Sequence, residues 1–199
     1  MSALLDVALL HYPVRDRAGA TVTTSVTNLD VHDIARSSCT FGVGRYYIVT
    51  PIEAQHVLVR RITEHWTTGA GRRRMPERHQ ALELCAPVTS LEEAIADATQ
   101  RHGKTPKLIA TAARGGTRPP TTFGELRATL RASAASAASA ASAASAEPYL
   151  LMLGTGHGLA DALLERADVL LEPIAGAGSY NHLSVRAAAA IVLDRLLGR

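Results

Sequence analysis

The sequence has few cysteines, no long apolar run and no basic leader, and each absence excludes a class of protein. Its two cysteines, Cys39 and Cys85, have neither metal-site nor redox-motif spacing, which argues against a disulfide scaffold and favours a reducing, cytoplasmic setting. No stretch approaches the roughly 20 apolar residues that span a membrane. Residues 1–10 contain Asp6 and no basic cluster, so we do not expect a signal peptide there.

What is present is the composition of a folded domain. The 199 residues are 47% hydrophobic and 20% charged, which excludes wholesale disorder and a collagen-like chain. This length predicts one domain over residues 1–199, with room for an insertion. The formal net charge of +3 permits an anionic partner without requiring one.

Short apolar runs alternate with helical patterns along the whole chain. We expect strands at 3–12, 45–50, 81–87, 107–113, 149–153 and 168–173, and helices at 30–41, 52–66, 90–102, 122–131, 154–166 and 183–197. Ser90 begins one helix, with Glu93 three residues on as in a capping box, and Gly103 ends it. Strands separated by helices predict an α/β fold with a mostly parallel sheet flanked by helices.

Two polar segments interrupt this alternation. Residues 67–78 contain Arg72, Arg73 and Arg74 in succession, and are expected to form either a solvated loop or a mobile loop that contacts phosphate groups. Residues 132–146 form an alanine tract with a serine at every third position, a period that gives a helix no apolar stripe. We interpret this tract as a low-complexity insertion, either an exposed linker or a frayed helical extension.

Glycine-containing turns follow the last two expected strands. The first, Gly154-Thr155-Gly156-His157-Gly158, does not match the dinucleotide pattern G-x-G-x-x-G, and no Gly-Lys-Ser/Thr of a phosphate loop follows it. The second turn leads through Gly176 into the last expected helix. Glycine allows close approach of a ligand to the backbone, and ligands of open α/β sheets bind beyond the carboxyl ends of strands. These turns therefore predict a ligand site, although the first turn could equally let its helix pack closely.

Polar residues just before the last helix have two interpretations. Ser179 or Asn181 is a candidate cap for this helix, and capping alone would account for both Asn181 and Ser184. His182 fits either a functional role or that of a hydrogen-bonded interior histidine. The run of alanines at 187–190 leaves room beside these residues for a ligand or another backbone.

The sequence resembles the SPOUT RNA methyltransferases, and within them a small bacterial group that depends on S-adenosylmethionine. Residues 154–197 resemble the second and third motifs of that superfamily, and the stretch YNHLSVR at 180–186 is the most specific part. Residues 28–43 resemble the first motif, which runs through a helix to an arginine and then to an aromatic–glycine pair. The resemblance covers almost the whole chain apart from the alanine tract.

This resemblance implies a fold, a cofactor and partners. The fold would be an α/β sheet whose C-terminal segment forms a trefoil knot, and the protein would be a homodimer with active sites at the subunit interface. S-adenosylmethionine would bind within the knot, and the substrate would be tRNA or rRNA, with no metal and no membrane involved. The residues that would contact the cofactor are Thr111, Ala112, Leu153, Gly154, Thr155, Gly156, His157, Glu172, Pro173, Ile174, Gly176, Asn181, Leu183, Ser184 and Val185.

By the same resemblance, Arg36 matches the motif arginine that approaches the nucleophile, and Ser184 and Asn181 would orient the cofactor or the acceptor. A ribose hydroxyl needs help in losing its proton, and Arg36 would stabilise the developing charge or bind the neighbouring phosphate. The alternative for Arg36 is a helix-surface ion pair with Asp30 or Asp33. RNA contact would fall to Arg36 and to Arg72, Arg73 and Arg74.

Two departures from the superfamily leave the acceptor atom open between a ribose 2′-oxygen and a base nitrogen. Asp30 stands where many ribose methyltransferases have asparagine, and His157 lies in a turn that usually contains glutamate. Two other functions remain as alternatives. One is a non-catalytic dimeric RNA-binding protein that retains the fold, and the other is a nucleotide-binding α/β enzyme of another class.

Overall fold

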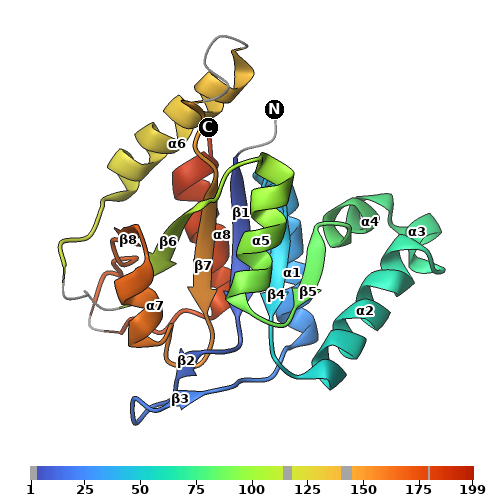
Figure 1. Cartoon of the computed structure of the whole chain (residues 1–199). Coiled ribbons are helices and arrows are strands. Elements are labelled where there is room, and N and C mark those ends of the chain that lie inside the picture. The colour runs from blue at the N-terminus through green and yellow to red at the C-terminus, as the bar shows by residue number, and fades with distance from the viewer. Residues whose placement is uncertain (1–3, 114–117, 140–144, 179) are drawn as a thin grey trace.

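A six-stranded parallel sheet forms the centre of the molecule (Figure 1). The computed structural model describes residues 4–113, 118–139, 145–178 and 180–199. The strand order of the sheet is β5-β4-β1-β7-β6-β8, and neighbouring strands pair in parallel. The strands are β1 (Leu5–Leu10), β4 (Tyr46–Val49), β5 (Cys85–Val88), β6 (Lys107–Thr111), β7 (Tyr149–Gly154) and β8 (Val169–Leu171). The predicted mostly parallel sheet is confirmed.

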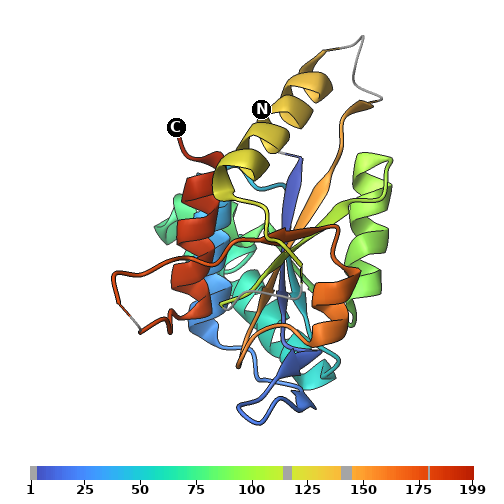
Figure 2. The same ribbon diagram turned by 90° about the vertical axis from the view of Figure 1, so that its left-hand side faces the viewer.

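Helices cover both faces of this sheet, as the sequence predicts. In Figure 2, α5 and α7 lie to the right of the sheet and α6 and α8 to its left. The helices are α1 (Asn28–Thr40), α2 (Glu53–Thr67), α3 (Gly71–Arg74), α4 (Pro76–Leu82), α5 (Leu91–His102), α6 (Phe123–Ala138), α7 (Asp161–Arg166) and α8 (Val185–Leu197). Among the described residues, no helix has the length and apolarity needed to cross a membrane.

Alternation along the strands divides the core into two halves. In β1, Val7 and Leu9 belong to the cluster that packs against α1, α6 and α8, whereas Ala8 and Leu10 belong to the cluster beneath α5 and α7. Successive strand residues point to opposite faces, so a strand buried on both faces needs apolar residues throughout. This explains why the strands are largely apolar on both faces rather than alternating, with the buried Asp6 of β1, which pairs with Arg101 and His102, as an exception.

Helix ends follow the capping signals in the sequence. The Ser90 side chain accepts a hydrogen bond from the backbone N–H of Glu93, and Gly103 ends α5 with a left-handed φ of 71°. Thr122 and Glu125 form a complete capping box at the start of α6. These caps satisfy backbone groups that the first and last turns of a helix leave without partners.

Three predicted boundaries are wrong in detail. Residues 154–166 are not one helix, because positive φ at Gly156 and Gly158 bends the chain and helix α7 begins only at Asp161. Residues 81–87 are not all strand, since Ala81 and Leu82 end α4. Residues 67–78 are not a loop: they contain α3 and the start of α4, where Pro76 supplies a preorganised first helical residue.

The alanine tract is less exposed than predicted. Helix α6 continues into it as far as Ala138. Ser133 is buried: its hydroxyl donates to the backbone carbonyl of Glu147 at 2.7 Å and accepts from the N–H of the same residue at 2.7 Å. The first part of the tract therefore packs against the entry to β7, while residues 140–144 lie outside the described residues.

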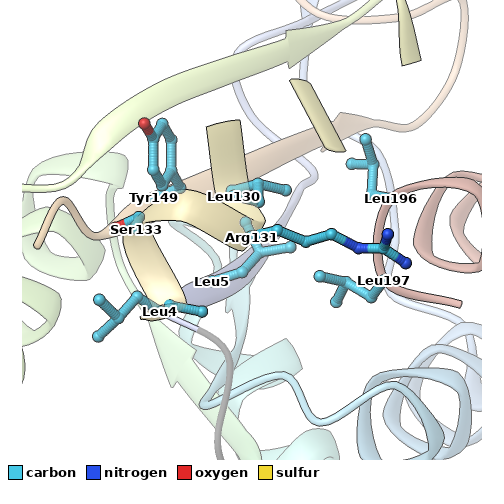
Figure 3. Close-up of a pocket in the computed structure, with 9 residues that line it drawn as sticks. Leu4, Leu5, Leu130, Arg131, Ser133, Tyr149, Leu196 and Leu197 are labelled. Atoms are coloured by element: carbon cyan, nitrogen blue, oxygen red, sulfur yellow. The ribbon is translucent and has the colours of Figure 1, made fainter. Parts of the chain in front are cut away.

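A small cavity lies at the amino-terminal end of the sheet, away from the expected ligand site. It has a volume of about 80 Å³. Figure 3 shows Leu130 and Arg131 of α6, Tyr149 at the start of β7, and Leu196 of α8 around it. Pockets for drug-sized ligands are several times larger, about 300–1,000 Å³, so this cavity is not a candidate for a nucleoside cofactor.

A β-hairpin that the sequence did not predict follows β1. Strands β2 (Val14–Arg15) and β3 (Thr21–Val22) pair in an antiparallel arrangement, and Figure 1 shows them beside the carboxyl ends of β1 and β7. The hairpin places residues 14–24 against the glycine turn after β7.

Candidate functional site

The candidate site lies at the carboxyl ends of the three adjacent strands β7, β6 and β8. Because neighbouring parallel strands end at the same edge of a sheet, the segments that follow Thr111, Gly154 and Leu171 converge there. These segments contain nearly all of the residues predicted to contact a cofactor. The topology thus gathers residues that are far apart in the sequence.

The turn after β7 is fixed by the hairpin. The N–H of His157 donates to the Arg15 carbonyl at 2.9 Å, and the N–H of Arg15 donates to the Gly158 carbonyl at 2.9 Å. Gly156 has a φ of 60°, and a Cβ at this position would lie 2.9 Å from the Arg15 carbonyl oxygen. A residue with a side chain would have to shift the hairpin, so glycine is required here. Gly156 and His157 are exposed, while Leu153 before them is buried.

The segment after β6 is linked to the segment before α8. The Asn181 side-chain amide donates to the Ala113 carbonyl at 3.2 Å. The Thr111 hydroxyl donates to the Met152 carbonyl at 2.9 Å, which joins the ends of β6 and β7. Ala112 packs against the cluster beneath α5 and α7. These contacts bring residues 111–113 and 181 to one place, as the resemblance implies.

The segment after β8 presents backbone groups rather than charged side chains. Glu172 is held at the start of α6, where its carboxylate accepts from the N–H of Phe123 at 2.6 Å, and Ile174 packs against the core. From Pro173 to Gly178, no backbone–backbone hydrogen bond joins this segment to another described residue. Its backbone N–H and C=O groups are therefore available to a ligand.

The start of α8 is capped by Ser184, whose hydroxyl accepts from the N–H of Ala187 at 3.3 Å. Of the two caps named from the sequence, Asn181 binds Ala113 instead, and Ser179 lies outside the described residues. The capping role that was the alternative for Ser184 is thus confirmed, while that for Asn181 is wrong. Leu183 is 46% exposed beside this cap, and Val185 packs against the core.

Arg186 links α8 to α1. Its guanidinium lies 3.6 Å from an Asp30 carboxylate oxygen and 3.5 Å from one of Asp33. The alternative of an ion pair between Arg36 and these acids is therefore wrong. Arg36 is exposed, and it makes no ion pair within the described residues. It lies eight residues after the start of α1, about 12 Å along the helix axis.

Helices α1, α2 and α4 meet around Trp66. The His32 ring packs edge-on against Trp66 with a centroid distance of 5.8 Å, and the Arg78 guanidinium lies 4.5 Å from the centre of the indole ring. Burial and, next, the positive charge of Arg78 lower the pKa of His32. The backbone of Gly71 packs directly against the indole ring, because a Cβ on Gly71 would lie 2.5 Å from Trp66. Residues 72–74 are exposed next to this cluster.

Sequence reasoning missed His11, which is fully buried just after β1. Its Nδ1 lies 3.0 Å from the Thr24 hydroxyl, which lies 2.5 Å from the hydroxyl of Thr155. Burial lowers the pKa of His11 from 6.5 to about 4. A lone histidine after a buried strand has no motif, and its partners come from other segments, so the sequence carries no signal for it.

Comparison with known proteins identifies the family. A family model described as SAM-dependent RNA methyltransferase matches residues 4–198. The chain belongs to this family. The resemblance stated from the sequence is confirmed.

Two curated relatives are longer than this chain. A protein of Oleidesulfovibrio alaskensis named tRNA (guanine-N(1)-)-methyltransferase is 49% identical over 98% of this chain, and one of Nitratidesulfovibrio vulgaris with the same name is 44% identical. The chain covers 42% of the length of each. A third relative, an uncharacterized protein of Aquifex aeolicus, is 39% identical over 97% of this chain and 88% of its own length.

Solved structures share the fold. TrmJ of Z. mobilis ZM4 has a TM-score of 0.60 at 14% identity, covering 98% of this chain and 68% of that one. The SpoU methyltransferase AviRb of Streptomyces viridochromogenes has a TM-score of 0.54 at 18% identity, covering 97% of this chain and 58% of that one. The predicted SPOUT-like α/β fold is confirmed, while the trefoil knot stays a prediction.

Proposed function

We propose that this protein transfers a methyl group from S-adenosylmethionine to RNA, with a ribose 2′-oxygen of tRNA or rRNA as the acceptor. The observation that carries this proposal is the convergence of three backbone segments at the carboxyl ends of β7, β6 and β8 in a chain of this family. The name guanine-N(1)-methyltransferase belongs to relatives more than twice as long, so it does not decide the acceptor for this chain.

The groups at the site suit S-adenosylmethionine. Residues 173–178 offer backbone donors and acceptors of the kind that recognise an adenine edge, and Ile174 and Leu183 offer apolar surface beside them. S-adenosylmethionine supplies a methyl group on a good leaving group, so the residues have to align the acceptor with it. The side chains of Thr111 and Glu172 are engaged in protein contacts, and we expect their backbones to face the cofactor.

We propose that Arg36 contacts the RNA acceptor group rather than the cofactor. Its guanidinium would stabilise negative charge on the ribose oxygen or bind the adjacent phosphate. Arg36 lies about 12 Å along α1 from the start of that helix, where Arg186 joins α1 to the start of α8. We therefore propose that Arg36 acts at the site of a second copy of the chain. A homodimer is supported by the exposed apolar residues near the starts of α1 and α8, where Leu29 is 57% and Tyr180 79% exposed.

Asn181 and Ser184 are proposed to orient the acceptor or the cofactor at the start of α8. We assign no catalytic role to Asp33 or His32, because Asp33 faces Arg186 and His32 packs against Trp66. We place the protein in the cytoplasm, which is supported by its two free cysteines, Cys39 and Cys85.

Calorimetric titration with S-adenosylmethionine tests the cofactor site. Wild-type protein should bind saturably, whereas Gly156→Ala should lose binding, because the added Cβ meets the Arg15 carbonyl and the positive φ disfavours alanine. Gly124→Ala is the control, since a Cβ there has no described atom closer than 4.0 Å. Absence of binding to wild type at millimolar cofactor would contradict the proposal.

A further inference from the structure

We propose that His11 is a positioning residue for the cofactor loop at 154–158, acting through Thr24 on Thr155. This inference rests on the proposed function of that loop. It assigns a role to a fully buried histidine just after β1 that belongs to none of the predicted site segments.

The hydrogen bonds that link His11, Thr24 and Thr155 can run in two directions, and one direction satisfies more donors and acceptors than the other. The Thr155 hydroxyl lies 3.0 Å from the Leu10 carbonyl, which can only accept, so Thr155 donates to it. Thr155 then accepts a hydrogen bond from the Thr24 hydroxyl, and Thr24 in turn accepts a hydrogen bond from His11 Nδ1–H. This gives three hydrogen bonds in sequence, with His11 as the Nδ1–H tautomer.

The reverse direction is less favourable. If Thr155 donates to Thr24 and Thr24 donates to His11 Nδ1, only two hydrogen bonds form. The imidazole proton would then lie on Nε2, which is buried and has no hydrogen-bond partner within the described residues. A buried donor without a partner costs about 1–3 kcal/mol. A neutral imidazole that donates from Nδ1 leaves Nε2 as an acceptor without a partner instead, so the two directions differ chiefly by the third hydrogen bond, from the Thr155 hydroxyl to the Leu10 carbonyl.

This chain of hydrogen bonds holds the cofactor loop together with the backbone contacts of Arg15. Thr155 binds Leu10 through both its N–H, at 3.2 Å, and its hydroxyl, while His157 and Gly158 bind Arg15. Thr24 is itself fixed, because its N–H donates to the His11 carbonyl at 2.8 Å. His11 is therefore the buried end of an arrangement that determines where Thr155 and Gly156 lie.

The experiment uses variants that separate donation from packing. His11→Asn keeps an N–H near the position of Nδ1, whereas His11→Leu keeps volume without a donor. Thr24→Ser keeps the hydroxyl, whereas Thr24→Val keeps the shape without it. We expect His11→Leu and Thr24→Val to weaken S-adenosylmethionine binding by about three- to tenfold, the effect of one hydrogen bond, and His11→Asn and Thr24→Ser to stay close to wild type.

Two measurements do not depend on the cofactor. Nitrogen NMR of the free protein should find the proton of His11 on Nδ1. Amide hydrogen exchange should be faster at Thr155 and His157 in His11→Leu and Thr24→Val, with unchanged exchange in α5 as evidence of intact folding.

The outcomes separate this inference from the proposed function. If wild type binds no cofactor, the proposed function fails, and hydrogen exchange still decides whether His11 positions the loop. In the double variant His11→Leu/Thr24→Val, cofactor affinity should fall no further than in either single variant, because both break one chain. Additive losses, a proton on Nε2, or His11→Asn behaving like His11→Leu would each overturn the inference.

Discussion

At the residue scale, the buried histidine makes the stability of the protein depend on pH. The pKa of His11 is lowered by burial to about 4, a shift that the negative charge of Asp30 partly opposes. Between about pH 4 and pH 6.5, the unfolded chain binds a proton at residue 11 that the folded protein does not. The free energy of unfolding therefore decreases as the pH falls through this range, by about 3 kcal/mol for a shift of this size.

Urea denaturation of wild type and His11→Asn at a series of pH values measures this contribution. Carboxylates titrate in the same range, so the difference between the two proteins isolates His11. The wild type should lose more stability than the variant between pH 6.5 and pH 4. Parallel pH profiles would contradict the assignment.

Single residues were predictable where the signal is local. The Ser90 cap was predicted, because it bonds to an atom three residues away and such spacing can be read from the sequence. Thr122 caps α6 in the same way, although the prediction did not name it. His11 was not predictable, because its function depends on Thr24 and Thr155, and the two threonines are 131 residues apart. Asn181 was named as a site residue from the resemblance, whereas its contact with Ala113 depends on the topology of the sheet.

At the scale of elements, α3 changes the interpretation of the arginine run. A charge run is usually a solvated loop, and the helix was missed because Gly71 and Trp66, which anchor it, form no periodic pattern. The hairpin β2–β3 was missed for a similar reason, since two-residue strands carry almost no signal. By contrast, the sheet strands and the long helices were predicted from their apolar runs and caps.

The exposed arginines of α3 are expected to contact RNA phosphates. Replacing Arg72, Arg73 and Arg74 together by alanine should weaken RNA binding and lower the salt dependence of the affinity by about two to three units, since each phosphate contact contributes about 0.7 to 0.9. Filter binding at several salt concentrations measures this slope. Alanine at Lys104, Lys107 and Arg166, which pair with glutamates, is the charge-matched control. Equal slopes for both triple variants would contradict the role of α3.

At the scale of the whole molecule, the parallel sheet gathers residues from three distant segments at one edge. The two glycine turns predicted a ligand site beyond the carboxyl ends of their strands, and only the resemblance added Thr111 and Ala112. Family membership confirms the resemblance on which the site residues rest. The sequence alone could not predict which side chains contact one another at this edge of the sheet. The engagement of Glu172 with α6 and of Arg186 with α1 depends on packing between elements far apart in the chain.

The central claim is methyl transfer to RNA, and incorporation of labelled methyl from S-adenosylmethionine into RNA from cells that lack the protein tests it most directly. The account predicts that wild type labels this RNA and that Gly156→Ala does not. Arg36→Ala should transfer far less methyl while binding the cofactor as tightly as wild type. Wild type that binds both S-adenosylmethionine and RNA without labelling the RNA would contradict the claim and favour a non-catalytic RNA-binding protein.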